Sequence, residues 1–233
     1  MDNILEINNL TKNYGRNFAV NNISFKIPAG KKVGLLGPNG SGKTTLIKTV
    51  MGLLSGHSGE VSVCGIPAGT EANKNISYLP DVTHIPTWFR VRQALDFFAD
   101  FYQDFDKLRA EEMLTTMGIP FGGTIKSLSR GMQEKVQLAL VMSRRAKLYI
   151  LDEPIGAVDP ASREFIIETI VKNFPSDSSI LLSTHIIADI EPILDTAIFL
   201  KDGEVILHNE VESLRQEKNT SLDGLFREVF RHA

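Results

Sequence analysis

The sequence has few of the features that mark secreted, membrane-spanning or nucleic-acid-binding proteins. It has a single cysteine, Cys64, in 233 residues, which excludes an internal disulfide and is typical of a reducing compartment. Its longest apolar stretches, such as residues 180–182 and 197–200, are far shorter than the roughly 20 residues of a membrane-spanning helix. Residues 1–6 lack the basic start and apolar run of a signal peptide. We therefore expect a soluble, cytoplasmic chain.

Neither sign of charge is in large excess. The 25 Lys and Arg residues and the 28 Asp and Glu residues give a net charge of −3, and the isoelectric point is about 6.0. This balance gives no general attraction to nucleic acid or to an anionic membrane surface, and we expect no nucleic-acid partner. Hydrophobic residues make up 42% of the sequence. Without internal repeats, this length predicts a single domain over residues 1–233.

Short apolar runs alternate with longer helical patterns, which is typical of an α/β domain with a mostly parallel sheet. Residues 5–7, 23–27 and 60–64 instead alternate between apolar and polar side chains. That alternation predicts half-exposed antiparallel strands near the N-terminus. A short strand is predicted at residues 33–36, and central strands at residues 76–79, 148–151, 180–183 and 197–200.

Between about residues 80 and 127 the pattern becomes helical and rich in aromatic side chains. Apolar residues at positions 91, 94, 95, 98, 101 and 102 form one stripe of a helix. We expect a helical subdomain over residues 81–132, inserted between core parts at residues 1–80 and 133–233. The stripe could pack in the core or dock a partner, and core packing is the favoured interpretation.

Residues 211–233 are expected to form a helical tail. The apolar side chains of Leu222, Leu225, Phe226, Val229 and Phe230 repeat with helical spacing and predict one amphipathic helix. This face could pack on its own domain or contact a second subunit, and packing on its own domain is favoured.

Residues 37–45 read GPNGSGKTT and match the phosphate-binding pattern G-x-x-x-x-G-K-[ST] between a predicted strand and a predicted helix. Glycine lets backbone N–H groups approach phosphate oxygens without a clashing Cβ atom, and the helix N-terminus favours an anion. Lys43 can reach the β- and γ-phosphates, and the Thr44 hydroxyl can bind Mg²⁺. The predicted nucleotide-binding residues of this loop are Gly37, Pro38, Asn39, Gly40, Ser41, Gly42, Lys43, Thr44 and Thr45.

The predicted strand at residues 148–151 ends in two acids, Asp152 and Glu153. Parallel sheets place ligands at the carboxyl ends of their strands. Asp152 can hold Mg²⁺ there, and Glu153 can polarise an attacking water. Two acids that merely cap a helix would be the simpler interpretation of this turn, but the phosphate-binding loop argues against it.

At this point the sequence resembles the ATP-binding subunits of ABC transporters. Residues 128–132, LSRGM, resemble the signature motif of that family and contain Ser129 and Gly131. Asp159 matches its D-loop, and His185 matches its switch histidine. Tyr14 matches the aromatic residue that stacks on adenine, although core packing is an equal alternative for it. The resemblance covers about residues 4–210.

The resemblance implies a P-loop NTPase core with a mostly parallel sheet, an N-terminal antiparallel β subdomain and an inserted α-helical subdomain. It also implies that the chain binds ATP and Mg²⁺ and hydrolyses ATP. In the family, each ATP lies between the phosphate loop of one chain and the signature motif of another. We therefore expect a homodimer or heterodimer of ATP-binding subunits, with integral membrane permease subunits as further partners. The resulting localisation is peripheral, at the inner face of the cell membrane.

Two residues depart from the family pattern. Asp81 stands where glutamine is usual; it can still bind Mg²⁺ through oxygen, but it adds negative charge near the phosphates. Arg130 stands where glycine is common, and the variant signature resembles bacterial exporter subunits whose membrane partner is a separate polypeptide.

The sequence thus predicts the cytosolic motor subunit of an ABC transporter, with an inclination to export. Glu153, His185 and Lys43 are the predicted catalytic residues, and Thr44, Asp152 and Asp81 the predicted metal ligands. One alternative is a soluble ABC-type ATPase for assembly or remodelling. Another is a regulatory nucleotide-binding module with weak hydrolysis.

Overall fold

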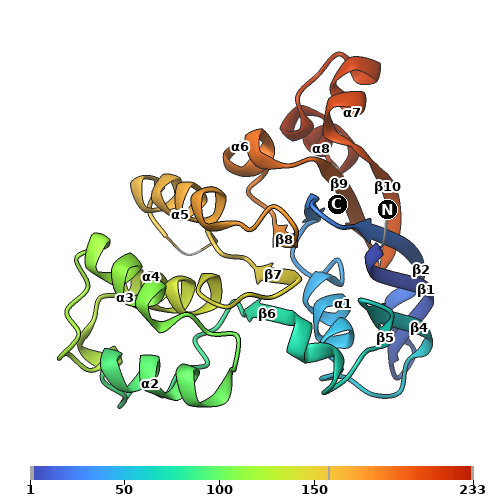
Figure 1. Cartoon of the computed structure of the whole chain (residues 1–233). Helices are drawn as coiled ribbons and strands as arrows, with labels where there is room; N and C mark the ends of the chain where they lie inside the picture. The colour runs from blue at the N-terminus through green and yellow to red at the C-terminus, as the bar shows by residue number, and fades with distance from the viewer. Residues whose placement is uncertain (1–2, 157, 232–233) are drawn as a thin grey trace.

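The computed structural model describes residues 3–156 and 158–231. Its strands form two sheets, and helices gather mainly on one side of the larger sheet (Figure 1). The strands are β1 (Asn3–Tyr14), β2 (Asn17–Pro28), β3 (Lys32–Leu36), β4 (Ser58–Val63), β5 (Ile66–Pro67), β6 (Ile76–Leu79), β7 (Leu148–Asp152), β8 (Ser179–Thr184), β9 (Thr196–Lys201) and β10 (Glu204–Glu210). The helices are α1 (Lys43–Val50), α2 (Val91–Phe101), α3 (Lys107–Thr116), α4 (Arg130–Met142), α5 (Pro160–Asn173), α6 (Ile187–Ile190), α7 (Val211–Lys218) and α8 (Leu222–Val229), with 3-10 turns η1 (Ala72–Asn75), η2 (Ile125–Ser127) and η3 (Glu191–Ile193).

The smaller sheet is antiparallel, in the order β2-β1-β4-β5. Its alternating sequence has the expected effect, because Leu5 and Ile7 are fully buried while Glu6 between them is partly exposed. Glu6 pairs with Lys26 of β2 at 2.8 Å on the outer face. The prediction of antiparallel strands near the N-terminus is confirmed.

The larger sheet has the order β10-β9-β3-β8-β7-β6, and all its neighbours are parallel except β9 and β10. The prediction that residues 76–79 form a central strand is wrong, because β6 lies at the edge. Ile76 and Leu79 of β6 are nevertheless buried, because the side chains of a strand point to the two faces of its sheet and are covered there, whether the strand is central or at an edge. Ser77 of β6, for example, donates its hydroxyl hydrogen bond to the Val141 carbonyl of α4 at 2.8 Å.

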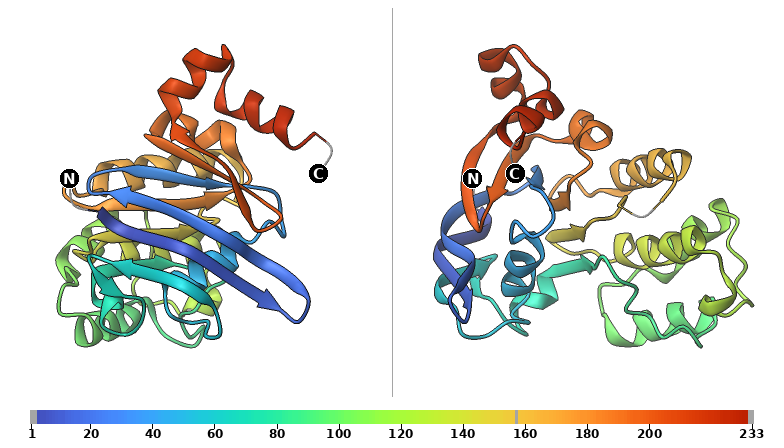
Figure 2. Two further views of the ribbon diagram at one scale, coloured as in Figure 1. Left: turned by 90° about the vertical axis from the view of Figure 1, so that its right-hand side faces the viewer. Right: turned by 180° about the vertical axis from the view of Figure 1, so that it is seen from behind.

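Helix α1 lies between the two sheets (Figure 2). Leu46 and Ile47 on this helix pack in one hydrophobic cluster with Ile7 of the small sheet and Ile150 of the large one. A second cluster fills the opposite face of the large sheet and includes side chains from α2 to α8. Since each fully buried Leu or Ile stabilises the fold by about 1.5–3 kcal/mol, these two clusters fix the position of the loop that precedes α1.

The helices α2, α3 and α4 form a layer beyond β6 and β7 (Figures 1 and 2). Val91, Leu95 and Phe98 of α2 are buried, as the core interpretation of the apolar stripe predicts. Phe101 is an exception, with 67% of its surface exposed, and it stacks on the half-exposed Phe97. None of the helices in the described ranges is long and apolar enough to cross a membrane.

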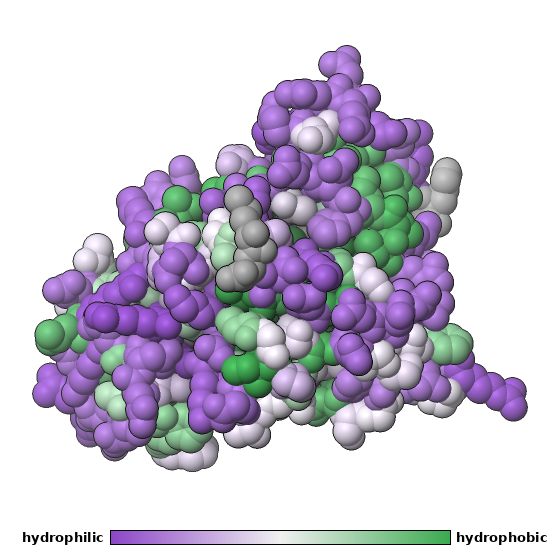
Figure 3. Space-filling view, turned by 45° about the vertical axis from the view of Figure 1, so that its right-hand side comes forward, coloured by the Kyte–Doolittle hydropathy of each residue, from purple (hydrophilic) through white to green (hydrophobic). Residues whose placement is uncertain are grey.

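The C-terminal tail folds back on its own domain, as the favoured interpretation predicts. Leu222 and Leu225 of α8 are buried, and the ring of Phe226 meets that of Phe199 in β9 edge-on at 5.5 Å. Hydrophobic side chains also gather on the surface beside this tail (Figure 3). Glu191 fixes the start of α8, because its carboxylate accepts backbone hydrogen bonds from Leu222 at 2.9 Å and Asp223 at 3.2 Å.

Candidate nucleotide-binding site

The phosphate-binding loop lies between β3 and α1, as predicted. Gly40 and Gly42 have φ values of 83° and 107°, which side-chain-bearing residues rarely adopt. A Cβ atom on Gly42 would lie only 2.2 Å from the Ala19 carbonyl oxygen of β2, and one on Gly37 would lie 2.4 Å from the Leu200 carbonyl oxygen. The glycines therefore allow the loop to pack tightly against β2 and β9 and to keep its curved shape.

The buried Lys43 joins this loop to the end of β7. Its Nζ donates to the carbonyl oxygens of Gly37 at 2.8 Å and Pro38 at 3.2 Å. It also lies 3.5 Å from Oε1 of Glu153. The second carboxylate oxygen, Oε2 of Glu153, is 3.0 Å from Nδ1 of His185. The three predicted catalytic residues thus form one contact chain, Lys43–Glu153–His185.

Glu153 has an unusual backbone conformation. Its φ is 51°, in the left-handed region that few residues with a side chain occupy. The Ser183 carbonyl oxygen accepts from its N–H at 3.0 Å, and the Ser183 hydroxyl lies 3.2 Å from the same N–H. Strain of this kind concentrates at functional sites.

Asp152 is buried at the end of β7 and accepts a hydrogen bond from the Ser183 hydroxyl. Burial raises the pKa of its carboxyl, hydrogen bonds from Ser183 and Thr44 oppose that shift, and the charges of Asp81 and Glu153 add to it. The structure therefore brings all three predicted metal ligands, Thr44, Asp152 and Asp81, into one neighbourhood. It does so because β3, β6 and β7 are parallel and end at the same edge of the sheet.

Thr44, Asp81 and Glu153 border an open cavity of about 220 Å³. Oδ2 of Asp152 and Oε1 of Glu153 are buried without a hydrogen-bond partner in the described ranges. Carboxylates with free lone pairs beside a threonine hydroxyl suit a hard divalent cation. No cluster of three or more His, Cys, Asp or Glu side chains that could hold a metal was found in the described residues. The oxygens of Thr44, Asp152 and Asp81 fit Mg²⁺ by their chemistry, and these residues would hold it. The cavity is lined by Ala19, Asn39, Gly40, Gly42, Lys43, Thr44, Thr45, Asp81 and Glu153.

The other predicted site residues lie elsewhere on the surface. Tyr14 ends β1 with 53% of its surface exposed, and the Lys12 Nζ lies 5.2 Å from its ring centre. Ser129 caps helix α4 by accepting from the Met132 N–H at 3.3 Å, and Gly131 follows in the first turn. Tyr14, Ser129 and Gly131 are not among the residues that line the cavity. The structure therefore leaves the signature motif apart from the phosphate loop of the same chain.

The predicted D-loop residue Asp159 caps α5 and accepts from the Ser162 N–H at 3.1 Å. Ala157, in the same motif, lies outside the described residues. Aspartate suits the N-cap position before a helix, and proline suits the first position within it, which explains the order Asp159-Pro160.

Two contributors to the site were missed by sequence reasoning. Ala19 lines the cavity with its backbone, and nothing in a sequence marks a backbone carbonyl from another sheet. Ser183 holds both Asp152 and the Glu153 N–H. The sequence did contain a sign of the role of Ser183, because this residue lies in the strand that leads to His185, two positions before that histidine.

Comparisons with known proteins agree with this geometry. The sequence model of the family described as "ABC transporter" matches residues 20–156. The uncharacterized ABC transporter ATP-binding protein YxlF of Bacillus subtilis (strain 168) is 32% identical over 226 residues, which cover 94% of this chain and 75% of the relative. The Nod factor export ATP-binding protein I of Rhizobium meliloti (strain 1021) is 30% identical, with 92% and 66% covered.

Solved structures also match. The ATP-binding subunit of an ABC transporter superposes with a TM-score of 0.88 at 26% identity, covering 97% of this chain and 99% of that one. A dimeric bacterial ABC transporter cassette shares the fold, with a TM-score of 0.78 at 24% identity and coverage of 88% and 98%. The phosphate loop, the acidic end of β7 and the histidine after β8 occupy one edge of this fold. The chain therefore belongs to the ABC transporter family, as an ATP-binding subunit that hydrolyses ATP.

Proposed function

We propose that this subunit powers export of a substrate through a separate membrane permease. ATP binding closes a pair of subunits, and hydrolysis reopens them. The observation that carries the ATP-driven step of the proposal is the Lys43–Glu153–His185 contact chain at the end of the parallel strands. The relationship to a Nod factor export protein and the Arg130 variant of the signature motif support the direction of transport.

In this mechanism the phosphate loop binds the phosphates through its backbone N–H groups and Lys43. Glu153 accepts a proton from the attacking water, and His185 donates a hydrogen bond to the γ-phosphate. Thr44, Asp152 and Asp81 would hold Mg²⁺, which neutralises negative charge on the phosphates when it is bound. Ser183 keeps Asp152 and Glu153 in place.

The site requires a second subunit. Ser129 and Gly131 begin a helix whose N-terminus favours an anion, but they lie away from the cavity of their own chain. In a closed pair they would face the nucleotide of the partner. Subunits of this family work as dimers, and a cassette of the same fold has been solved as one. Tyr14 would stack on adenine, and Asp159 would lie at the contact between subunits.

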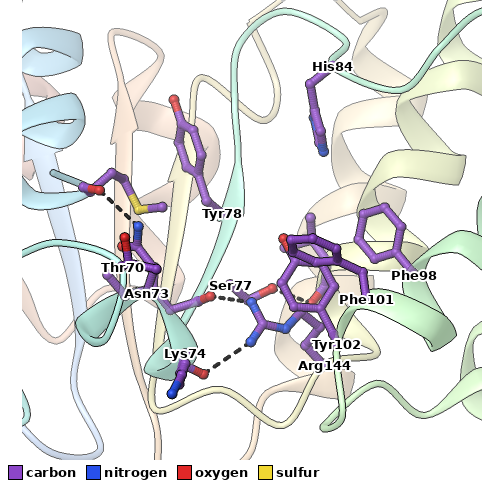
Figure 4. A pocket seen from close by; sticks show the side chains of 13 residues that line it. Thr70, Asn73, Lys74, Ser77, Tyr78, His84, Phe98, Phe101, Tyr102 and Arg144 are labelled. Carbon is purple, nitrogen blue, oxygen red and sulfur yellow. Dashed lines mark hydrogen bonds between the residues drawn. The ribbon is translucent and has the colours of Figure 1, made fainter. Parts of the chain in front are cut away.

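A groove between β6 and the helical layer is the proposed contact with the permease. It is a cavity of about 450 Å³ with Phe98, Phe101 and Tyr102 on one wall and Asn73, Lys74 and Tyr78 on the other (Figure 4). Its floor is held by Arg144, which donates to the Lys74 carbonyl at 3.1 Å. We infer that a cytoplasmic helix of the permease inserts its apolar face here. Such contacts would place the subunit at the inner face of the cell membrane.

The chemistry is tested by the Glu153→Gln variant. It should retain ATP binding and accumulate as a closed dimer, with phosphate release reduced by about 100-fold or more. Phosphate release measures turnover, and size-exclusion chromatography with ATP measures the dimer. Glu168→Gln, on the exposed face of α5, is the matched control. Unchanged phosphate release in Glu153→Gln would refute the assignment, and a parent rate equal to that of Lys43→Ala would favour a regulatory module.

The permease contact is tested by the Phe101→Asp variant. It should abolish co-purification with the polytopic membrane protein encoded beside this chain while basal ATP hydrolysis continues. Leu108→Asp, at an equally exposed position on α3, should change neither. Equal recovery of the membrane protein with both variants would contradict the proposed groove. A chain with no such neighbour would favour the soluble ATPase for assembly or remodelling.

A further inference from the structure

Helix α4 does more than present the signature motif at its start. Arg130, Glu134 and Gln137 lie at positions i, i+4 and i+7, so they follow one face of the helix. Arg130 is at the exposed end, and Gln137 is only 4% exposed. This face leads from the signature motif towards the segment that follows β6, which contains Asp81.

Gln137 makes a direct contact with that segment. Its Nε2 donates to the Thr83 hydroxyl at 2.8 Å, two residues after Asp81. Oε1 of Gln137 is buried without a hydrogen-bond partner in the described part of the chain. A buried amide that is satisfied on one side holds its partner firmly, because losing that hydrogen bond would leave a second buried polar atom unpaired.

Glu134 acts on the same segment through its charge. Its Oε1 accepts from the Arg130 Nε at 3.3 Å, and its Oε2 is buried without a hydrogen-bond partner in those same described ranges. Burial raises the pKa of the Glu134 carboxyl, Arg130 opposes that shift, and the charge of Asp81 adds to it. Glu134 and Asp81 are therefore close enough to repel each other.

A small cavity separates these groups from the catalytic acid. It has a volume of about 30 Å³ and is lined by Asp81, Glu134, Gln137 and Glu153. This is room for one or two water molecules. A movement of α4 or a change in the charge of its side chains is therefore transmitted to Asp81 with little solvent between them.

We propose that Gln137 and Glu134 are positioning residues for Asp81, through which α4 connects the signature motif to the acidic end of its own nucleotide site. The proposal rests on the proposed function, in which Ser129 and Gly131 face the nucleotide of a second subunit, and it places Arg130, between them in the sequence, at the same nucleotide. Phosphate there would attract the Arg130 guanidinium and leave Glu134 without its counter-charge. The repulsion between Glu134 and Asp81 would then increase and move the Asp81 segment.

The structure provides a reporter for that segment. Trp88, the only tryptophan in the sequence, lies seven residues after Asp81 and is 74% exposed. Its ring contacts that of Phe89 edge-on at 6.3 Å. Trp88 fluorescence therefore follows the segment between β6 and α2 without any label.

The test measures Mg²⁺ titrations of the full chain saturated with a non-hydrolysable ATP analogue, followed by Trp88 fluorescence. Thr83→Val and Gln137→Met remove the contact from opposite sides. Each variant should raise by about 10-fold the Mg²⁺ concentration at which half of the change in Trp88 fluorescence has occurred. The affinity of the chain for the ATP analogue, measured in the absence of Mg²⁺, should stay the same. Thr83→Ser, which keeps the hydroxyl, should match the parent chain. Parent-like titrations for both Thr83→Val and Gln137→Met would overturn the proposal, and Thr83→Val decides alone if Gln137→Met does not fold.

The charge link has its own test. Glu134→Gln and Arg130→Ala should both reduce the Hill coefficient of ATP hydrolysis towards 1. Glu168→Gln, which breaks an i, i+4 ion pair of 3.1 Å on exposed α5, should leave it at the parent value. A Hill coefficient that does not change in Glu134→Gln and Arg130→Ala would refute the link. Such a result would leave the proposed function intact, because phosphate release by the parent chain, Lys43→Ala and Glu153→Gln tests that function independently.

Discussion

The contact between the phosphate loop and β2 predicts how two similar substitutions will differ. Gly40 and Gly42 both have φ values that favour glycine, 83° and 107°. Alanine at either position should therefore cost about 1–3 kcal/mol of backbone strain. Only at Gly42 would the new Cβ also meet another part of the chain, the Ala19 carbonyl oxygen at 2.2 Å. At Gly40 there is no heavy atom within 4 Å of that position.

The magnitude follows from that difference. Contacts of a Cβ atom under 3.0 Å do not occur in real structures, so the loop or β2 must move by nearly 1 Å. Overpacking of this kind typically costs about 1–3 kcal/mol. We expect Gly42→Ala to be about 2 kcal/mol less stable than Gly40→Ala. In a chain of this size that difference corresponds to a melting temperature lower by roughly 4–8 °C.

The assay is thermal unfolding of the nucleotide-free chain, followed by circular dichroism. Gly131→Ala is the matched control, because its Cβ would lie in open space on helix α4 without a positive φ. It should melt no lower than the parent. Calorimetric titration should also show weaker ATP binding by Gly42→Ala, since the first turn of α1 would be displaced. Equal melting temperatures for Gly40→Ala and Gly42→Ala would refute the view that β2 supports the loop.

Two further predictions concern buried carboxylates. Burial acts to raise the pKa of Glu191, but the Leu222 N–H, the Arg215 side chain and the Asp223 N–H together hold it below 4.5. Glu191→Gln should therefore lower the free energy of unfolding by about 3 kcal/mol at pH 7. The difference from the parent should narrow as pH falls below 4.5, because Glu191 of the unfolded parent takes up a proton there while the native carboxylate, with its lowered pKa, is still ionised. Urea denaturation at several pH values checks this, with the exposed Glu212→Gln as control; a difference that does not depend on pH would contradict it. Ser183→Ala should lower the free energy of unfolding by about 1–3 kcal/mol, because it leaves a buried oxygen of Asp152 without its donor. It should also slow phosphate release more than it weakens ATP binding. Loss of binding alone would argue against a role for Ser183 at the acidic end of β7.

The sequence by itself determined the chemistry of the site. Glycines in the pattern of residues 37–45, a lysine and two acids after an apolar strand carry their meaning in their spacing, because each depends on local backbone geometry. The apolar strands were predictable for the same reason.

The tertiary structure decided which distant residues meet. No local pattern distinguishes an edge strand covered by helices from a central one, so β6 was assigned wrongly. The stripe on α2 could not reveal that Phe101 lies exposed beside a groove. No sequence pattern reveals that Ala19 lies against Gly42. Nor does any pattern reveal that Gln137 holds the Asp81 segment through Thr83, which lies 54 residues earlier in the sequence. These contacts depend on how sheets and helices pack, and packing is a property of the whole chain rather than of any one segment.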